Sequence, residues 1–254
     1  MKKHLIYLFV LFCSSANAQK TLDMPIGLVP PVPWFEGTHQ LIYKNRAATC
    51  FPIKAPNSKS CFVTALHTFK TTKRNGGDTI RYRNGDTVNI IVYINNAWLR
   101  FNGHLYYHTD TLIDIAVIEV PNLNLTGDPD TLNGSPLVIG QDCFFFGYPL
   151  NKKMTFKESK TIKSNSLPLV NKGIYSGSQF LNDSISVTYV SAHNTYGYSG
   201  GPVIGYNYMD KKWQLLGVVS GYYPQRNADN SRENSGIMGV SEVRYLVQIM
   251  QKVR

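Results

Sequence analysis

Long apolar runs and metal-ligand spacings are scarce in this 254-residue chain, and each shortage excludes a class of protein. Beyond the apolar residues near the start, no run of 18 apolar residues occurs, so we expect no membrane span in the mature protein. His104 and His108 lie four residues apart without a glutamate between them, in a segment that favours strand or loop. The zinc-protease motif is therefore absent, and we expect no metal site and no cofactor.

Arginine-rich helices are also absent, although the chain is basic. It carries 26 lysines and arginines against 16 aspartates and glutamates, a formal net charge of +10. Such a charge could favour nucleic acid, an anionic surface or acidic peptides. Because no arginine-rich helix accompanies it, we interpret the charge as a contribution to solubility and expect no nucleic-acid partner.

The first 18 residues have the pattern of a secretory signal peptide. Lys2 and Lys3 precede an apolar run at 5–12, and Ala16 and Ala18 form a small-x-small cleavage site. The apolar run is too short for a membrane anchor. We therefore expect cleavage after Ala18 and a secreted or periplasmic mature protein.

Short β-rich runs alternate with turn signals along most of the chain. Asparagine-glycine pairs at 75–76, 84–85 and 133–134 mark turns. The clearest apolar runs cover residues 87–94, 115–120, 186–190 and 215–223. Many short strands with few helical periods predict an all-β sandwich or barrel.

Both ends of the mature chain differ from this β-rich middle. Residues 19–36 contain four prolines, and we expect an extended tail there. After Ser241, a candidate N-cap, apolar residues recur at helical spacing and predict a closing helix. They are Val243, Leu246, Val247 and Met250.

Ser199 stands between glycines in Gly197-Tyr198-Ser199-Gly200-Gly201, just before an apolar run that predicts a strand. A nucleophilic serine needs backbone N–H groups that turn toward one point, where an oxyanion can form. Glycine neighbours allow such a turn and leave room for a substrate carbonyl. The segment therefore indicates a catalytic serine, although an ordinary turn serine would also fit it.

The order of histidine, aspartate and serine discriminates between folds. The Gly-x-Ser-x-Gly pattern also matches the α/β-hydrolases, whose histidine follows the serine, but this chain has no histidine after Ser199. The subtilisin order needs an aspartate first, and in the mature chain only Asp23 precedes His67. His67, Asp114 and Ser199 fit the remaining order.

In these segments the chain resembles the chymotrypsin-fold (trypsin-like) serine proteases, and Gly147-Tyr148-Pro149 is more weakly similar to bacterial members. Four segments carry the resemblance, from about residue 40 to the C-terminus: Thr64-Ala65-Leu66-His67, Asp114-Ile115-Ala116-Val117, Gly197-Tyr198-Ser199-Gly200-Gly201-Pro202 and Gly217-Val218-Val219-Ser220-Gly221.

This resemblance implies an all-β fold of two six-stranded antiparallel β-barrels with a short C-terminal helix. The first barrel is expected at residues 37–126, a linker at 127–136, and the second barrel with the helix at 137–254.

The resemblance also assigns roles to the site residues. Ser199 would be the nucleophile, and His67 the base that takes its proton, because the ordinary pKa of histidine suits this task. Asp114 would hold the histidine ring, and the N–H groups of Gly197 and Ser199 would form the oxyanion hole. Two simpler interpretations remain: His67 as a core histidine and Asp114 as a turn residue, with Asp110 as its nearest competitor.

Specificity is expected to depend on the residues flanking the serine. His193 aligns with the base of the primary pocket, where it could favour an acidic residue before the scissile bond; alternatively it packs elsewhere or points away. Thr195 would line the same pocket. Ser220 would lie near the aspartate and begin the substrate-pairing segment with Gly221 and Tyr222, and Tyr222 would narrow the pocket.

Many animal relatives have an aspartate just before the serine, which pairs with a new N-terminus after zymogen cleavage. This chain has Tyr198 there, and we expect activity without propeptide cleavage. Cys50 and Cys61 lie on two runs joined by a turn, and similar proteases often carry a disulfide beside the histidine, so we expect them to pair. Cys143 is expected to be a buried free thiol.

The function that these features predict is an exported serine endopeptidase that acts on proteins or peptides through an acyl-enzyme, as a monomer. The alternative from another class is a non-catalytic binding or adhesion protein on the same fold. An esterase or other acyl hydrolase is a further alternative.

Overall fold

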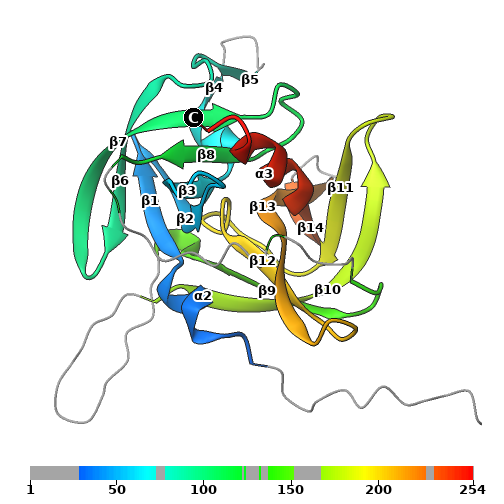
Figure 1. Ribbon diagram of the computed structural model, residues 1–254. Coiled ribbons are helices and arrows are strands. Elements are labelled where there is room, and N and C mark those ends of the chain that lie inside the picture. Colours follow the sequence, from blue (N-terminus) through cyan, green and yellow to red (C-terminus); the bar gives the residue numbers. More distant parts are fainter. Residues whose placement is uncertain are drawn as a thin grey trace, which may run out of the picture.

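Two closed antiparallel β-barrels contain most of the strands (Figure 1). The computed structural model describes residues 29–72, 78–121, 123, 132, 137–151, 167–226 and 232–253. The predicted all-β, two-barrel fold is confirmed. Of the domain boundaries, the signal peptide 1–18 and all of the linker 127–136 except Leu132 lie outside the described residues.

The first barrel has the strand order β1-β2-β3-β8-β7-β6. Its strands are β1 (His39–Tyr43), β2 (Arg46–Lys54), β3 (Ser60–Thr64), β6 (Thr87–Ile94), β7 (Ala97–Tyr107) and β8 (Ala116–Glu119). On β6, buried Val88, Ile90 and Val92 alternate with more exposed residues, because successive side chains of a strand point to opposite faces. A two-stranded sheet of β4 (Lys70–Thr72) and β5 (Asp78–Ile80) extends from this barrel.

The second barrel has the order β10-β11-β14-β13-β12-β9. Its strands are β9 (Asp142–Gly147), β10 (Leu169–Phe180), β11 (Ser186–Ser191), β12 (Pro202–Asn207), β13 (Lys212–Arg226) and β14 (Arg232–Glu242). Buried apolar residues such as Phe145, Val203 and Val240 fill its interior. The runs expected at 186–190 and 215–223 lie on β11 and β13.

A shared core joins the two barrels and the C-terminal helix α3 (Val243–Met250). β3 and β8 are buried on both faces: Phe62 and Ile118 point into the first barrel, whereas Val63 and Val117 point into the shared core. Leu215 and Val218 of β13 meet the same core, as do Leu246 and Ile249 of α3. Burial against both barrels fixes one barrel on the other, and the chain segments that follow β3 and precede β8 therefore have a defined position relative to the second barrel.

The closing helix is confirmed, but its predicted N-cap is wrong. Glu242 occupies the N-cap position, without a side-chain capping bond, and Ser241 is still part of β14. The hydroxyl of Ser241 is hydrogen-bonded to Asp114 and Ser220 instead, so it contributes to the site described below.

The N-terminal segment also differs from the extended tail that its prolines predicted. Residues 32–36 form the single-turn helix α2 (Val32–Glu36), with Pro31 at the N-cap and Pro33 in the first turn. Proline fixes φ near the helical value and lacks only an N–H that this turn leaves unpaired, so it favours a helix start. Residues 19–28 lie outside the described residues.

The predicted disulfide between Cys50 and Cys61 is contradicted, since both are buried free thiols. On β2 and β3, Cys61 is the register partner of Ile53, and Cys50 lies three residues away from that partner. An odd offset places two side chains on opposite faces of the sheet. Cys50 accordingly packs inside the first barrel, and Cys61 packs in the shared core. Cys143 is a buried thiol, as predicted.

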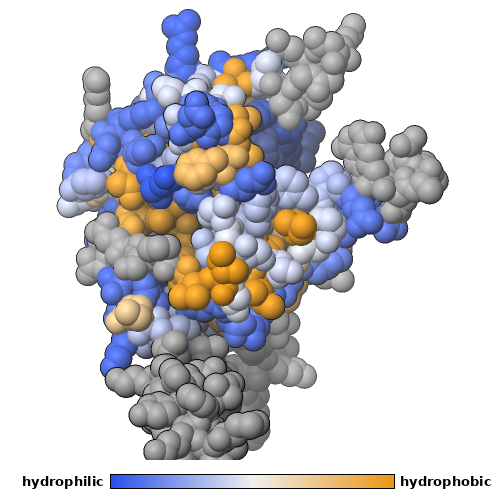
Figure 2. Space-filling model, turned by 90° about the vertical axis from the view of Figure 1, so that its right-hand side faces the viewer, coloured by the Kyte–Doolittle hydropathy of each residue, from blue (hydrophilic) through white to orange (hydrophobic). Residues whose placement is uncertain are grey.

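The surface carries apolar side chains in separate patches among hydrophilic ones, as seen on the β10–β11 side of the molecule (Figure 2). Ile174 and Phe180 of β10 are 47% and 67% exposed. Within the described residues, none of the helices has the length and apolar character needed to cross a membrane.

Candidate active site

His67 and Asp114 meet where the first barrel faces the second. His67 lies in the short 3₁₀ helix η1 (Leu66–Phe69) directly after β3, and Asp114 lies just before β8. Because β3 and β8 pair antiparallel, with Thr64 opposite Ala116, the end of one strand lies beside the start of the other. The fold therefore brings together two residues 47 positions apart.

Both carboxylate oxygens of Asp114 are bound to His67. Oδ2 lies 2.6 Å from Nδ1 of the ring, and Oδ1 accepts a hydrogen bond of 2.7 Å from the backbone N–H. The backbone N–H of Leu66 also donates to the Asp114 carbonyl at 3.3 Å. These contacts fix the ring orientation and favour the tautomer with the proton on Nδ1, which leaves Nε2 as a base.

Ser241 and Ser220 support Asp114 from the second barrel. The N–H of Asp114 donates to Ser241 Oγ at 3.2 Å, and the hydroxyls of Ser241 and Ser220 lie 2.8 Å apart. Ser220 thus lies near the aspartate, as the resemblance implied, with Ser241 between them. The alternative residue, Asp110, has a local role, because its carboxylate accepts from the N–H of Leu112 at 2.9 Å within a turn.

The loop that carries Ser199 is folded against both barrels through its glycines. Gly197 and Gly200 have φ values of +104° and +85°, in the region that favours glycine. A Cβ on Gly200 would lie 2.2 Å from the Thr49 carbonyl oxygen, and one on Gly197 would lie 2.3 Å from the Tyr148 carbonyl oxygen. Tyr198 is buried between them, with its ring 4.9 Å from that of Phe145.

The peptide planes of this loop turn two N–H groups away from the scaffold. The carbonyl of Tyr196 accepts from Leu150 N at 3.1 Å, and that of Tyr198 accepts from Gly201 N at 2.8 Å. In a trans peptide the N–H points opposite to the C=O. The N–H groups of Gly197 and Ser199 therefore point away from these contacts, and neither has an acceptor among the described residues. An oxyanion hole needs free donors of this kind.

Thr49, on β2 of the first barrel, forms hydrogen bonds with this loop. The sequence analysis did not identify it. Its hydroxyl lies 2.6 Å from the carbonyl oxygen of Gly197, to which it donates, and accepts from Tyr148 N at 3.2 Å. Its backbone N–H donates to the Ser199 carbonyl at 2.9 Å. Thr49 is fully buried, and nothing in its local sequence distinguishes it from a core threonine.

His67 and Ser199 both line a cavity of about 410 Å³. Its walls come from η1, the serine loop and β13: His67, Asn194, Thr195, Tyr196, Ser199, Ser220, Gly221, Tyr222 and Pro224. The structure thus brings His67, Thr195, Ser199 and the 220–222 segment to one place. Among the described residues, no hydrogen bond joins the Ser199 hydroxyl to the His67 ring.

His193 is not in this cavity. Its side chain is exposed, and its backbone carbonyl accepts from the Asn171 side chain at 2.9 Å. The neighbouring residue Asn194 lines the cavity instead. Of the two interpretations of His193, the structure fits the one in which its side chain points away from the pocket.

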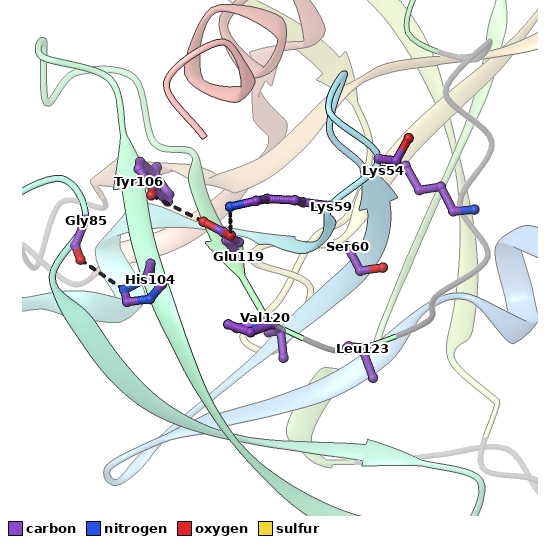
Figure 3. Close-up of a pocket in the computed structure, with 11 residues that line it drawn as sticks. Lys54, Lys59, Ser60, Gly85, His104, Tyr106, Glu119, Val120 and Leu123 are labelled. Atoms are coloured by element: carbon purple, nitrogen blue, oxygen red, sulfur yellow. Dashed lines mark hydrogen bonds and ion pairs between the residues drawn. The ribbon is translucent and has the colours of Figure 1, made fainter. Parts of the chain in front are cut away.

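A second cavity, of about 890 Å³, is larger and lies on the outside of the first barrel (Figure 3). Its buried carboxylate, Glu119, already has partners: Lys59 Nζ at 2.5 Å and the Tyr106 hydroxyl at 3.3 Å. His104 on its wall is bonded through Nδ1 to the Gly85 carbonyl oxygen at 3.1 Å. His67, Asp114 and Ser199 do not line it. The smaller cavity is therefore the candidate active site. Within the described residues, no group of three or more histidines, cysteines or acidic residues could hold a metal.

Solved protease structures share this fold. The inactive form of the Rv3671c protease matches with a TM-score of 0.54 and 18% identity, over 90% of this chain and 99% of that one. The active form, from M. tuberculosis, matches with a TM-score of 0.53 and 18% identity over 87% and 82%. The MamO protease domain from Magnetospirillum magneticum matches with a TM-score of 0.52 and 13% identity over 85% and 97%.

No protein-family model and no curated protein matches the sequence. At 13–18% identity the structural matches show a common fold, the chymotrypsin-like double barrel. What the site does must therefore be argued from its own residues.

Proposed function

We propose that the chain is a serine endopeptidase that hydrolyses peptide bonds through Ser199, His67 and Asp114. The observation that carries the proposal is the contact between His67 Nδ1 and Asp114 at 2.6 Å, with His67 and Ser199 on the walls of one cavity. The fold that the chain shares with protease domains supports the same reaction class.

In the proposed reaction, Ser199 Oγ attacks the carbonyl carbon of the scissile bond while Nε2 of His67 takes the hydroxyl proton. The resulting oxyanion accepts hydrogen bonds from the N–H groups of Gly197 and Ser199. The imidazolium then gives its proton to the leaving amine, and an acyl-enzyme on Ser199 remains. Water, deprotonated by His67, attacks this ester, releases the acid and restores the serine hydroxyl.

The missing hydrogen bond between Ser199 and His67 is compatible with this sequence of steps. Catalytic hydrogen bonds are often long in free enzymes and shorten when substrate excludes water. The two residues come from different barrels, and the shared core fixes the barrels on each other.

Activation by zymogen cleavage is not part of the proposal. Tyr198, where many animal relatives have an aspartate, is buried against Phe145, and the loop carbonyls are held by Leu150, Gly201 and Thr49. Packing thus shapes the loop without a new N-terminus. We further propose export through residues 1–18, peptide or protein substrates, and a monomer.

Cleavage of a denatured protein substrate by residues 19–254 tests the proposal, with Ser199→Ala as the matched control. The enzyme is expected to produce fragments, and the Ser199→Ala protein none, with the same thermal stability. A wild-type protein that leaves the substrate intact but retains it as tightly as Ser199→Ala would contradict the proposal and support the non-catalytic binding protein.

A further inference from the structure

The most informative polar group of the cavity is the side chain of Asn194. Asn194 is 2% exposed and lines the cavity beside Thr195, Tyr196 and Ser199. Its Oδ1 is buried and has no hydrogen-bond partner among the described residues. A buried amide oxygen without a donor is unfavourable, so it favours any ligand that supplies one.

The backbone of Asn194 is held by neighbours whose amide groups are already used. The side-chain amide of Asn234 donates to the Asn194 carbonyl, and Asn234 Oδ1 accepts from Gly236 N at 2.9 Å. On the other side, Asn171 holds the carbonyl of His193. These contacts fix the main chain on either side of the Asn194 side chain, which can only rotate about its own bonds. They thereby hold Asn194 at the wall of the cavity.

Among the described residues, the other walls of the cavity carry no acidic side chain and, apart from His67, no basic one. They are hydroxyls, aromatic rings, glycine and proline. A lysine or arginine side chain would therefore be buried without a carboxylate, and an ionised glutamate without a cation, because His67 is reserved for catalysis. Burying an unpaired charge is strongly unfavourable. The cavity, about 410 Å³, has room for a medium-sized side chain.

We propose that Asn194 is the specificity-determining residue and selects a glutamine or asparagine before the scissile bond. The inference rests on the proposed function. A primary amide offers N–H donors to Oδ1 and a carbonyl acceptor to Nδ2, so two amides can pair edge to edge. Neither an apolar nor a charged side chain satisfies both groups. This replaces the acidic preference that the position of His193 suggested.

The test compares cleavage of five peptides that differ only in the residue before the scissile bond: Gln, Asn, Glu, Lys and Leu. The wild-type protein is expected to cleave the Gln and Asn peptides with kcat/KM at least about tenfold above the other three, since the site rejects side chains that leave its amide unpaired. A preference for Glu, Lys or Leu would overturn the inference.

Two substitutions assign the preference to Asn194. Asn194→Asp keeps the size but adds a negative charge, so it is expected to shift the preference to Lys by about tenfold or more. His193→Ala, the control at the adjacent exposed position, is expected to leave the preference as in the wild type. If His193→Ala changes the preference while Asn194→Asp does not, the inference is wrong.

Fluorophosphonate labelling of Ser199 separates this inference from the proposed function. A wild-type protein that is labelled but prefers Glu, Lys or Leu keeps the proposed function and loses the role of Asn194. A folded wild-type protein that is neither labelled nor active loses both. Should Asn194→Asp fail to fold, the wild-type peptide profile alone still decides the substrate class.

Discussion

The two barrels contribute to the candidate site in different ways. The first barrel supplies His67 and Asp114 as a finished unit, with both carboxylate oxygens bound within 2.7 Å and both residues attached to buried strands. The second barrel supplies Ser199 and most of the cavity wall from the serine loop and β13. In that loop Tyr196 is 73% exposed, and the amide oxygen of Asn194 has no partner among the described residues.

This difference matches two different roles in the proposed function, proton transfer and substrate recognition. In the proposed reaction, His67 and Asp114 need a fixed geometry before substrate arrives, because a wrong tautomer or a turned ring stops proton transfer. In the same proposal the pocket wall contacts substrates directly, so its polar groups can remain unpaired until a substrate side chain binds them. Two hydrogen bonds connect the two halves. Thr49 of the first barrel donates to the serine loop, and Ser241 of the second barrel accepts from the N–H of Asp114.

Removing the negative charge from the first-barrel unit should have the largest effect. Asp114→Asn is expected to lower kcat/KM for peptides by about 10⁴-fold, because an amide no longer holds the His67 tautomer with the proton on Nδ1. The loss is measured as kcat/KM for peptide hydrolysis at pH 7.5. Asp110→Asn is the control, since its carboxylate accepts from the N–H of Leu112 within a turn, and it should lower kcat/KM by less than about twofold. The reverse order of effects would identify Asp110 as the orienting residue.

Cutting the link from the first barrel to the serine loop should have a smaller effect. Thr49→Val keeps the shape but removes the hydroxyl that binds the Gly197 carbonyl. We expect kcat to fall about ten- to a hundredfold with KM nearly unchanged, because the oxyanion donors lose their support. Thr49→Ser keeps the hydroxyl and should restore most of kcat. An equal loss in both variants would show that Thr49 serves only packing.

The positions of the strands and of the triad candidates followed from the sequence because their signals are local. The alternation of apolar residues at 87–94 predicted a strand, and β6 covers these residues. The glycines around Ser199 predicted a tight turn, and Gly197 and Gly200 have positive φ values. The role of Thr49 depends on contacts with residues about 100–150 positions away, and a buried threonine on a strand has no distinctive local pattern.

The errors share a physical cause. The face to which a side chain points depends on strand register and on the local turn, and a shift of one residue reverses it. Cys50 and Cys61 were placed on the correct pair of strands but on the wrong relative faces. Ser241 was placed one residue before the true N-cap, Glu242, and its hydroxyl instead accepts from the N–H of Asp114, 127 positions away.

His39, in the first barrel, should make the free energy of unfolding depend on pH. Burial lowers the pKa of His39, on β1, to about 4. The unfolded chain takes up a proton near pH 6.5, before the folded chain does, so stability falls as pH drops from about 6.5 to about 4. We expect a loss of about 1–3 kcal/mol, measured by urea unfolding at pH 7 and pH 4.5. His39→Gln should flatten this dependence; an unchanged slope would exclude His39 as its source.

Reducing agent should have the smallest effect. Burial raises the pKa of Cys61 and of Cys143 to about 12 and raises that of Cys50 as well, so all three thiols stay protonated at neutral pH. We expect slow alkylation in the folded protein, three alkylated thiols after unfolding without reductant, and an unchanged Tm in dithiothreitol. Protection of Cys50 and Cys61 until reduction would restore the predicted disulfide.

The most direct test of an assembled site is covalent labelling of residues 19–254 with a fluorophosphonate, followed by mass mapping of the modified peptide. The account predicts one adduct on Ser199, absent in Ser199→Ala and strongly reduced in His67→Ala. A folded wild-type protein that forms no adduct, or one whose labelling is unaffected by His67→Ala, would contradict a catalytic serine activated by His67.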